Sequence, residues 1–447
     1  MNKVNTKKEV KKRISSLAVL NPTAAGIDVS DKEMMVALPI SKVHIETKCF
    51  GSFTRDLYLL RDYLQANGIT TVAMESTGVY WVPLFLLLQE SEIEVILVNA
   101  KHVKNVTGRK EDESDAEWIQ KLHSCGLLQA SFQPDNMTRT LRSLVRHRKN
   151  LVRTSASYLN RIQKALELMN IKIHTVISDI DGKTGTRIVE AILEGERDPE
   201  ILSDLADSRI KASREEIIKS LEGYWTKEHL FELKQCYQIY KVHREMIVEC
   251  DNEIQTQLIE QIAANHEGEI PDVTVKRKSS GKKGVNFNAT EQITKLLGVN
   301  ITEVFGISEL SGLTILSETG LNMSAWKTEH HFTSWLGLAP NNKISGGKII
   351  SSKVNKKKHH AGQAFRIAAN SLYNNKSPLG DYYRRIKSRA GAGKAVVATA
   401  RKLAIIYYKM VSEKEAFNPS ALENYQRQYK ELKIKQLKKR LANLEAA

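Results

Sequence analysis

The sequence predicts an α/β domain near the N-terminus and a mainly helical remainder. The first observation is a set of short β-rich segments between residues 24 and 53, separated by polar turns. The second is an alternation of helical and strand patterns over residues 54–99. The third is a pair of long stretches, 136–169 and 227–263, whose apolar residues recur at helical spacing. Together they indicate a chain of class α/β plus α.

The β-rich segments AAGIDVS, KEMMVALPI and HIETKCFGSF favour an antiparallel meander of three strands. The elements expected after it are a helix at 54–67, a strand at 69–75, a helix at 82–89, a strand at 93–99 and a helix that begins near Asp112. Three strands followed by alternating helix and strand is the order of a ribonuclease H-like fold. We therefore expect this fold over residues 21–130.

Two long helices are expected to form an arm over residues 131–265. The first, from Asn136 to Leu166, carries eight Lys or Arg and no acid, so the faces beside its apolar stripe are basic. In the second, apolar residues recur every seven positions, at Leu233, Tyr240, Ile247 and Ile254. Arg244 and Asp251 occupy two intervening core positions, so a coiled coil there would be imperfect. The pair is either an arm for dimerisation or strand binding, or an ordinary helical hairpin packed on its own domain.

The remaining segments complete the expected organisation. They are a basic arm at 1–20, a basic linker at 266–300, a mainly helical C-terminal domain at 301–412 and a charged amphipathic helix at 413–447. From Phe332 to Gly380 the C-terminal domain contains eight Lys or Arg and no acid. A segment with so one-sided a charge repels itself unless it meets an anion.

The composition also points to a nucleic-acid partner. The chain of 447 residues has 67 Lys and Arg against 51 Asp and Glu, a net charge of +16. Its four cysteines lie far apart without the spacing of a zinc site or a disulfide framework. The longest apolar run, from Val79 to Leu88, is too short to cross a bilayer. We therefore expect a cytoplasmic protein with no membrane contact.

Four carboxylates stand where a metal site can be built. Asp28 ends the first predicted strand and Glu75 the fourth, and functional groups gather at such strand ends. Asp112 and Asp115 lie one helical turn apart and can point to the same side. Hard oxygen donors from separate segments suit magnesium, which binds a few carboxylates together with water and phosphate oxygens. Such ions support phosphoryl transfer.

Each carboxylate also has a purely structural interpretation. Ser114 and Glu117 match a capping box, so Asp115 could simply stand at the positive end of a helix. Asp28 could form a turn, and Glu75 could precede the start of a helix. Taken together, and at these positions in the expected order of strands, the four acids favour the metal-binding interpretation.

Four motifs along the chain carry a resemblance. They are GIDVS, AMESTGVYWVPLF, VNAKHVKNVTGRKEDESDAEWIQKLHSCGLL and FTSWLGLAPNNKISGGK. Together they resemble the DEDD-type insertion-sequence transposases, a family that includes the Piv-type DNA invertases and the bridge-RNA-guided recombinases. The first three motifs fall in the RuvC-like domain of that family and the last in its C-terminal transposase domain. The resemblance covers roughly residues 20–170 and 300–405.

The resemblance implies an enzyme that cuts and rejoins DNA through a transient phosphoserine link. The metal-binding acids of the family correspond to Asp28, Glu75, Asp112 and Asp115, and its nucleophilic serine corresponds to Ser345. The implied cofactor is magnesium. The implied partners are donor and target DNA, an element-encoded bridge RNA and further copies in a homodimer or homotetramer, in a prokaryotic, nucleoid-associated setting. From the residues alone, Ser345, Ser351 and Ser352 are rival hydroxyls of one basic loop.

Basic residues near these motifs are the expected nucleic-acid contacts. They are Arg109, Lys110, Arg142, Arg146, Arg148, Lys149, Arg153, Lys343, Lys348 and Arg366. Gly346 and Gly347 would let the backbone approach a phosphate closely. If a guide RNA pairs with the DNA, these side chains need read little sequence.

Two other functions fit the same residues. A metal-dependent, structure-specific DNA nuclease would use the four acids and water, and would not need Ser345. An inactive nucleic-acid-binding protein that coats or represses the element would need none of the acids.

Overall fold

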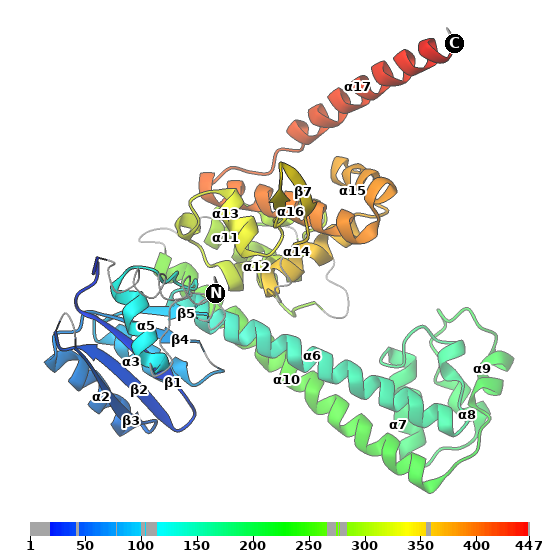
Figure 1. Ribbon diagram of the computed structural model, residues 1–447. Helices are drawn as coiled ribbons and strands as arrows, with labels where there is room; N and C mark the ends of the chain where they lie inside the picture. The colour runs from blue at the N-terminus through cyan, green and yellow to red at the C-terminus, as the bar shows by residue number, and fades with distance from the viewer. Residues whose placement is uncertain are drawn as a thin grey trace, which may run out of the picture. The chain divides into compact units, whose positions relative to one another are not determined.

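The computed structural model of the chain describes residues 18–41, 44–76, 78–99, 103, 114–265, 274–275, 277, 284–354 and 359–445. The chain divides into two compact units, Met1–Gln133 and Pro134–Ala447 (Figure 1). Most of the expected basic arm, residues 1–17, and the parts 266–273, 276 and 278–283 of the expected basic linker lie outside the described residues. No helix of the described segments is long and apolar enough to cross a membrane.

The first unit is built on a five-stranded sheet of order β3-β2-β1-β4-β5. Its strands are β1 (Ala24–Val29), β2 (Glu33–Pro39), β3 (Ile45–Gly51), β4 (Thr71–Glu75) and β5 (Glu94–Val98). β2 pairs antiparallel with both β1 and β3, whereas β4 pairs parallel with β1 and β5 pairs parallel with β4. The predicted meander and the alternation of helix and strand after it are confirmed.

Helices cover both faces of this sheet. They are α2 (Thr54–Ala66), α3 (Trp81–Glu90) and α5 (Asp115–Ser124). On one face, Leu60 of α2 and Leu84 of α3 belong to the same apolar core as Ile27 of β1. On the other face, Trp118 of α5 packs in a second core with Ala73 of β4. Side chains alternate along a strand, so each strand serves both cores. The mixed α/β domain predicted for the N-terminus is confirmed.

The second unit begins with two long helices, α6 (Asn136–Leu168) and α10 (Lys227–Asn265), which pack against each other. The chain between them forms η1 (Ile173–Thr175), α7 (Lys183–Glu194), α8 (Pro199–Asp204) and α9 (Arg214–Leu221). These short helices share an apolar core with Leu166 near the end of α6 and Leu233 near the start of α10. They lie at one end of the α6–α10 pair (Figure 1). α6 and α10 therefore form a helical hairpin within one chain.

A buried ion pair joins the two long helices. Arg148 of α6 is 3% exposed, and its guanidinium donates to the Asp251 carboxylate of α10 and, at 2.6 Å, to the Gly284 carbonyl. The Asp251 carboxylate also accepts the backbone N–H of Asn286 at 3.1 Å. A buried charge needs such partners, so the acid at this core position of α10 is accommodated. The expectation that Arg148 contacts nucleic acid is corrected, because its guanidinium is enclosed and paired.

The rest of the second unit is mainly helical, as predicted. Its elements are α11 (Ala289–Leu297), η2 (Ile301–Glu303), α12 (Glu309–Thr319), η3 (Met323–Ala325), α13 (Glu329–Trp335), β6 (Lys343–Ser345), β7 (Lys348–Ser351), α14 (His360–Ser371), α15 (Pro378–Ala390), α16 (Ala392–Glu413) and α17 (Pro419–Glu445). Phe332, Phe365 and Tyr407 are fully buried at its centre. The expected linker at 266–300 is wrong at its C-terminal end, where α11 lies. The Asn288 side chain accepts the Glu291 N–H and caps the start of this helix.

Candidate active site

Two of the predicted acids lie at the ends of neighbouring parallel strands: Asp28 is the last but one residue of β1, and Glu75 is the last residue of β4. Ile27 of β1 lies opposite Met74 of β4, so Asp28 and Glu75 are the next residues along the same register. Residues at one level of a parallel pair point to the same face. Two residues earlier, Ala73 packs against α5, and the alternation of side chains therefore puts both acids on the α5 face. Each acid is partly exposed.

α5 packs unusually close to β1, at Gly26. A Cβ added to Gly26 would lie 2.3 Å from both the Ala116 carbonyl oxygen and the Gln120 backbone nitrogen. Such a distance between non-bonded atoms is prohibitive, so only glycine allows the helix backbone to approach the strand in this way. Gly26 lies on the same face of β1 as Asp28, two residues further on.

The direction of α5 brings a third acid to the same edge. Near the end of the helix, the Gln120 side chain donates to the Ala24 carbonyl at 3.1 Å, and His123 Nε2 shares a hydrogen bond of 2.9 Å with Thr71 Oγ1. Ala24 and Thr71 begin their strands, so α5 ends at the beginnings of β1 and β4. Its first residue, Asp115, therefore lies toward the opposite edge, where Asp28 and Glu75 lie at the ends of those strands.

The predicted capping box at the start of α5 is confirmed. Ser114 Oγ accepts the Glu117 backbone N–H at 3.2 Å, and the Glu117 carboxylate accepts the Ser114 N–H at 3.1 Å. These reciprocal bonds fix the first turn of the helix and with it the exposed Asp115. The structural and the metal-binding interpretations of this stretch are compatible.

The described donors suit a divalent metal ion in their chemistry. Asp28, Glu75 and Asp115 supply hard oxygen atoms at one partly open edge of a sheet, as magnesium-type ions require. Asp112, the fourth expected donor, lies outside the described residues, as do Arg109 and Lys110. Within the described segments, no three His, Cys, Asp or Glu side chains are grouped to hold a metal. The expected four-acid site therefore stays a prediction.

Gly26→Ala should loosen the packing that positions Asp115. The added methyl would force α5 away from β1, and overpacking of this kind costs about 1–3 kcal/mol or more. We expect faster hydrogen exchange in peptides that span β1 and α5, together with reduced DNA cutting. Gly393→Ala is the matched control, because a Cβ there meets no atom within 4 Å and alanine favours helix. Unchanged protection of α5 in Gly26→Ala would contradict this account.

Ser345 ends the first strand of a β-hairpin. Ser345 lies opposite Lys348, and Ile344 lies opposite Ile349. The loop between the strands is Gly346 and Gly347, with φ of 55° and 73°. Two successive residues with positive φ are characteristic of the type I′ turn, which suits the twist of a two-residue hairpin. A Cβ on either glycine would meet no atom within 4 Å, so backbone conformation requires these glycines.

The hairpin distinguishes the three rival serines. The Ser351 hydroxyl accepts the Lys353 backbone N–H at 3.4 Å and is partly buried. Ser345 is exposed, and no residue in the described segments forms a hydrogen bond with its hydroxyl. Directly opposite side chains have Cβ atoms about 4.5–5.5 Å apart, so the Lys348 ammonium can reach an anion bound at Ser345. Ser352 is exposed one residue beyond β7.

Two of the expected basic contacts join α6 to α12. The Arg146 guanidinium binds both carboxylate oxygens of Glu318, at 2.7 and 2.8 Å. Arg142 donates to the carbonyls of Ser317 and Glu318, at 3.3 and 2.7 Å. Burial raises the pKa of Glu318, but the hydrogen bonds and charge of Arg146 and the charge of Arg142 outweigh it, so the pKa is lowered. These arginines therefore stabilise the fold, although Arg146 keeps 44% of its side chain exposed.

Arg366 is also engaged within the chain, since it donates to the Gly337 carbonyl at 2.8 Å. Besides Arg146, which is paired with Glu318, the expected contacts whose side chains are exposed in the described segments are Lys149, Arg153, Lys343 and Lys348. They lie on α6 and on the β6–β7 hairpin.

A histidine that sequence reasoning missed lies close to these residues. His359 Nδ1 accepts the Gly362 N–H at 3.4 Å and caps α14, while its ring packs edge-on against Trp335 at 4.0 Å. Burial lowers the pKa of His359 to about 4, so the ring is neutral at pH 7 and keeps its acceptor. The next residue, His360, lies 3.5 Å from the Lys149 ammonium. A polar residue three positions before a glycine at a helix start was the available signal.

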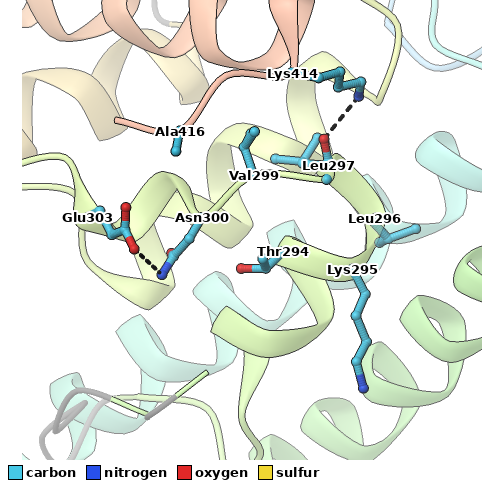
Figure 2. A pocket seen from close by; sticks show the side chains of 10 residues that line it. Thr294, Lys295, Leu296, Leu297, Val299, Asn300, Glu303, Lys414 and Ala416 are labelled. Carbon is cyan, nitrogen blue, oxygen red and sulfur yellow. Dashed lines mark hydrogen bonds between the residues drawn. The ribbon is translucent and has the colours of Figure 1, made fainter. Parts of the chain in front are cut away.

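A pocket of about 470 Å³ lies elsewhere in the second unit, where α11 and α16 end (Figure 2). The Lys414 ammonium donates to the Leu297 carbonyl at 2.9 Å, and the side chains of Asn300 and Glu303 are 3.5 Å apart. None of the candidate catalytic residues lines this pocket. The pocket is therefore separate from the residues that are predicted to carry the chemistry.

Comparison with protein families found two matches. Residues 25–171 match the family model for DEDD transposases of the IS110 type, described as a transposase. Residues 286–384 match the model described as Transposase IS116/IS110/IS902 family. The first match contains the predicted acids and the second contains Ser345. No curated protein matches the chain.

Proposed function

We propose, because this chain belongs to the IS110 family of DEDD transposases, that it cuts and rejoins DNA through a covalent bond to Ser345. Membership makes it a DNA transposase and implies dependence on a divalent metal. The observation that carries the serine proposal is the exposed hydroxyl of Ser345, opposite Lys348 on a rigid hairpin. The resemblance of this segment to the family's serine motif points to the same residue.

We assign the first unit to the ribonuclease H-like fold, in its RuvC-like form. Support comes from the strand order β3-β2-β1-β4-β5, with three antiparallel strands first and two parallel strands after them. Helices on both faces of the sheet agree with this assignment. The proposed metal site at the carboxyl ends of β1 and β4 is then at the edge where open α/β sheets bind ligands.

The proposed metal ligands are Asp28, Glu75, Asp112 and Asp115, and the proposed metal is magnesium. When bound, the metal withdraws charge from the reacting phosphate and favours the ionised form of an attacking hydroxyl. The ends of β1 and β4 position the Asp28 and Glu75 carboxylates, and the capped start of α5 positions the Asp115 carboxylate. Lys348 balances the negative charge of the phosphate that Ser345 attacks.

In the proposed step, Ser345 Oγ forms a bond to a DNA phosphorus and the bond from phosphorus to one deoxyribose oxygen breaks. The serine proton passes to a base or solvent, and the leaving oxygen gains a proton. One phosphoester replaces another, so a second DNA end can attack the phosphoserine and restore the DNA without an energy source. Hydrolysis would leave no phosphoserine bond from which the DNA could be rejoined.

The proposed partners follow from the family resemblance and the charge. Donor and target DNA are the substrates, and an element-encoded bridge RNA pairs with both. Exposed Lys149, Arg153, Lys343 and Lys348 contact the nucleic-acid backbones. Four strands must be broken and exchanged, so we propose a homodimer or homotetramer.

The test is to map the covalent bond. Full-length protein from cells that carry the element is incubated with a plasmid bearing the element, and its peptides are analysed by mass spectrometry. A nucleotide on Ser345 is expected. Cut strands without any nucleotide on the protein would instead support the structure-specific nuclease. Sequencing the RNA that co-purifies tests guidance separately, and the absence of element-encoded RNA would refute it.

A further inference from the structure

The β6–β7 hairpin carries three exposed isoleucines beside Ser345. Ile344, Ile349 and Ile350 are 62%, 60% and 70% exposed. Ile344 and Ile349 lie opposite each other, so their side chains project from the same face. Ile350 is the extra residue where the register of the pair shifts by one. We refer to these three side chains as the isoleucine face.

Ser345 and Lys348 project from the other side of the hairpin. They follow Ile344 and precede Ile349, and successive side chains on a strand point to opposite faces. The two-residue turn through Gly346 and Gly347 fixes this register. The hairpin is therefore a thin ribbon with a hydroxyl and an ammonium on one face and Ile344 and Ile349 on the other, while Ile350 lies at the bulge beside Ile349.

The charge around the hairpin indicates what covers the isoleucine face. Phe332 to Gly380 contains no Asp or Glu, and Lys343, Lys348 and Lys353 are exposed on or beside the ribbon. Two copies of so basic a ribbon would repel each other, whereas a polyanion would be attracted. DNA is the polyanion that a transposase must bind. Its phosphates match the lysines, and the flat faces of its bases are apolar.

Proteins combine these two features of DNA by inserting apolar side chains, isoleucine among them, between neighbouring base pairs. Flanking basic residues hold the phosphates while the wedge separates the stack. A two-stranded ribbon is narrow enough to enter a groove of the duplex. The β6–β7 hairpin has the apolar groups, the lysines and the narrow shape for this type of contact.

We propose that the isoleucine face is a wedge that inserts between base pairs of the DNA substrate and unstacks the step beside the phosphate presented to Ser345. The position of that phosphate rests on the proposed function, whereas the insertion does not. Ser345 projects from the opposite face of the same thin ribbon, so a ribbon that enters a groove edge-on presents the wedge and the hydroxyl to neighbouring positions of the duplex.

The experiment measures unwinding of DNA. Full-length Ser345→Ala protein is mixed with a closed circular plasmid bearing the element and a metal-independent topoisomerase I in EDTA, and the linking number is read after deproteinisation. Neither serine chemistry nor metal-dependent cutting operates under these conditions. We expect the linking number to fall as bound protein increases, because an inserted wedge lowers the twist of the duplex.

The decisive variant adds Ile344→Thr, Ile349→Thr and Ile350→Thr, which keep β-branched side chains and so preserve strand preference. We expect this variant to lose the unwinding. The matched control is Ile201→Thr on α8, since Ile201 is 52% exposed outside the hairpin; it should unwind like its parent. Ile350→Lys adds a charge that maintains DNA binding and should also lose unwinding, which separates insertion from affinity.

Unwinding by the triple variant or by Ile350→Lys at the level of the Ser345→Ala parent would overturn the wedge. So would a parent protein that binds the plasmid without unwinding it. If the isoleucine face instead joins two copies, the triple variant would sediment as a smaller species while unwinding stays unchanged. Failure of the serine proposal has a different signature, which is the absence of a nucleotide on Ser345 in the wild-type protein.

Discussion

Ser345→Ala should abolish the covalent protein–DNA adduct and recombination, with a loss of about 10³-fold or more. The substitution removes the attacking oxygen and nothing else, because the Ser345 side chain is exposed and its hydroxyl forms no hydrogen bond with any described residue. Folding and DNA binding should therefore be retained. The adduct is measured by gel shift after denaturation, and recombination by a plasmid assay that scores rejoined junctions.

Ser351→Ala and Ser352→Ala are the matched controls, since both hydroxyls lie in the same basic region. Ser351→Ala loses only a contact with the Lys353 N–H, which is worth about 1 kcal/mol at most. Both controls should form the adduct. If Ser345→Ala forms the adduct and one of these variants does not, the nucleophile is that other serine. If Ser345→Ala cuts DNA at the normal rate and no adduct ever forms, the protein is a hydrolytic nuclease.

Asp28→Asn should reduce DNA cutting by about 10²-fold or more, and Glu75→Gln should do the same. Each substitution keeps the shape of the side chain but removes the negative charge that a divalent ion requires. Both residues lie at strand ends and are partly exposed, so the sheet should remain folded. Metal binding, measured by calorimetry, should weaken together with activity.

The matched control is Glu94→Gln, because Glu94 is an exposed acid that begins β5 at the opposite edge of the same sheet. It should cut DNA at the wild-type rate. Asp28→Asn protein that cuts DNA at the wild-type rate would exclude the acid site. Wild-type protein that binds DNA but never cuts it would favour a protein that only binds nucleic acid.

The strands and helices were predictable because their periodic patterns are local. Alternating apolar residues of 24–53 and the helical repeat of Leu57, Leu60 and Leu64 suffice to locate these elements, and the buried positions agree with them. The position of Asp28 and Glu75 at the ends of neighbouring parallel strands was also predictable in outline, since strand ends gather functional groups. The close packing of α5 at Gly26 could not be predicted, because a glycine in a strand sequence does not show which other element packs against it.

Whether each arginine of α6 is paired within the chain or exposed depends on residues far away in the sequence, so the sequence of α6 alone could not predict it. Arg148 lies seven residues after the buried Leu141, on the stripe that packs inward, but its acidic partner Asp251 is 103 positions away. Glu318 is 172 positions away from Arg146. A run of basic residues therefore contained both structural arginines and exposed ones, and composition alone could not separate them.

The hairpin was available in the sequence but was interpreted as a loop. Gly346 and Gly347 separate two β-branched stretches, a signal for a two-residue turn. The basic composition of this segment indicated phosphate binding instead. The register that places Ser345 opposite Lys348 follows from that turn.

The bonds between α6 and α12 have a mechanical consequence. A helix of 33 residues is about 50 Å long, and α6 carries the α7–α9 helices at one end while Arg142 and Arg146 fasten its other end to Glu318. Force applied to α7–α9 is therefore transmitted along a stiff rod to the domain that bears Ser345. A partner bound to those short helices would therefore constrain, through α6, the orientation of the domain that bears Ser345.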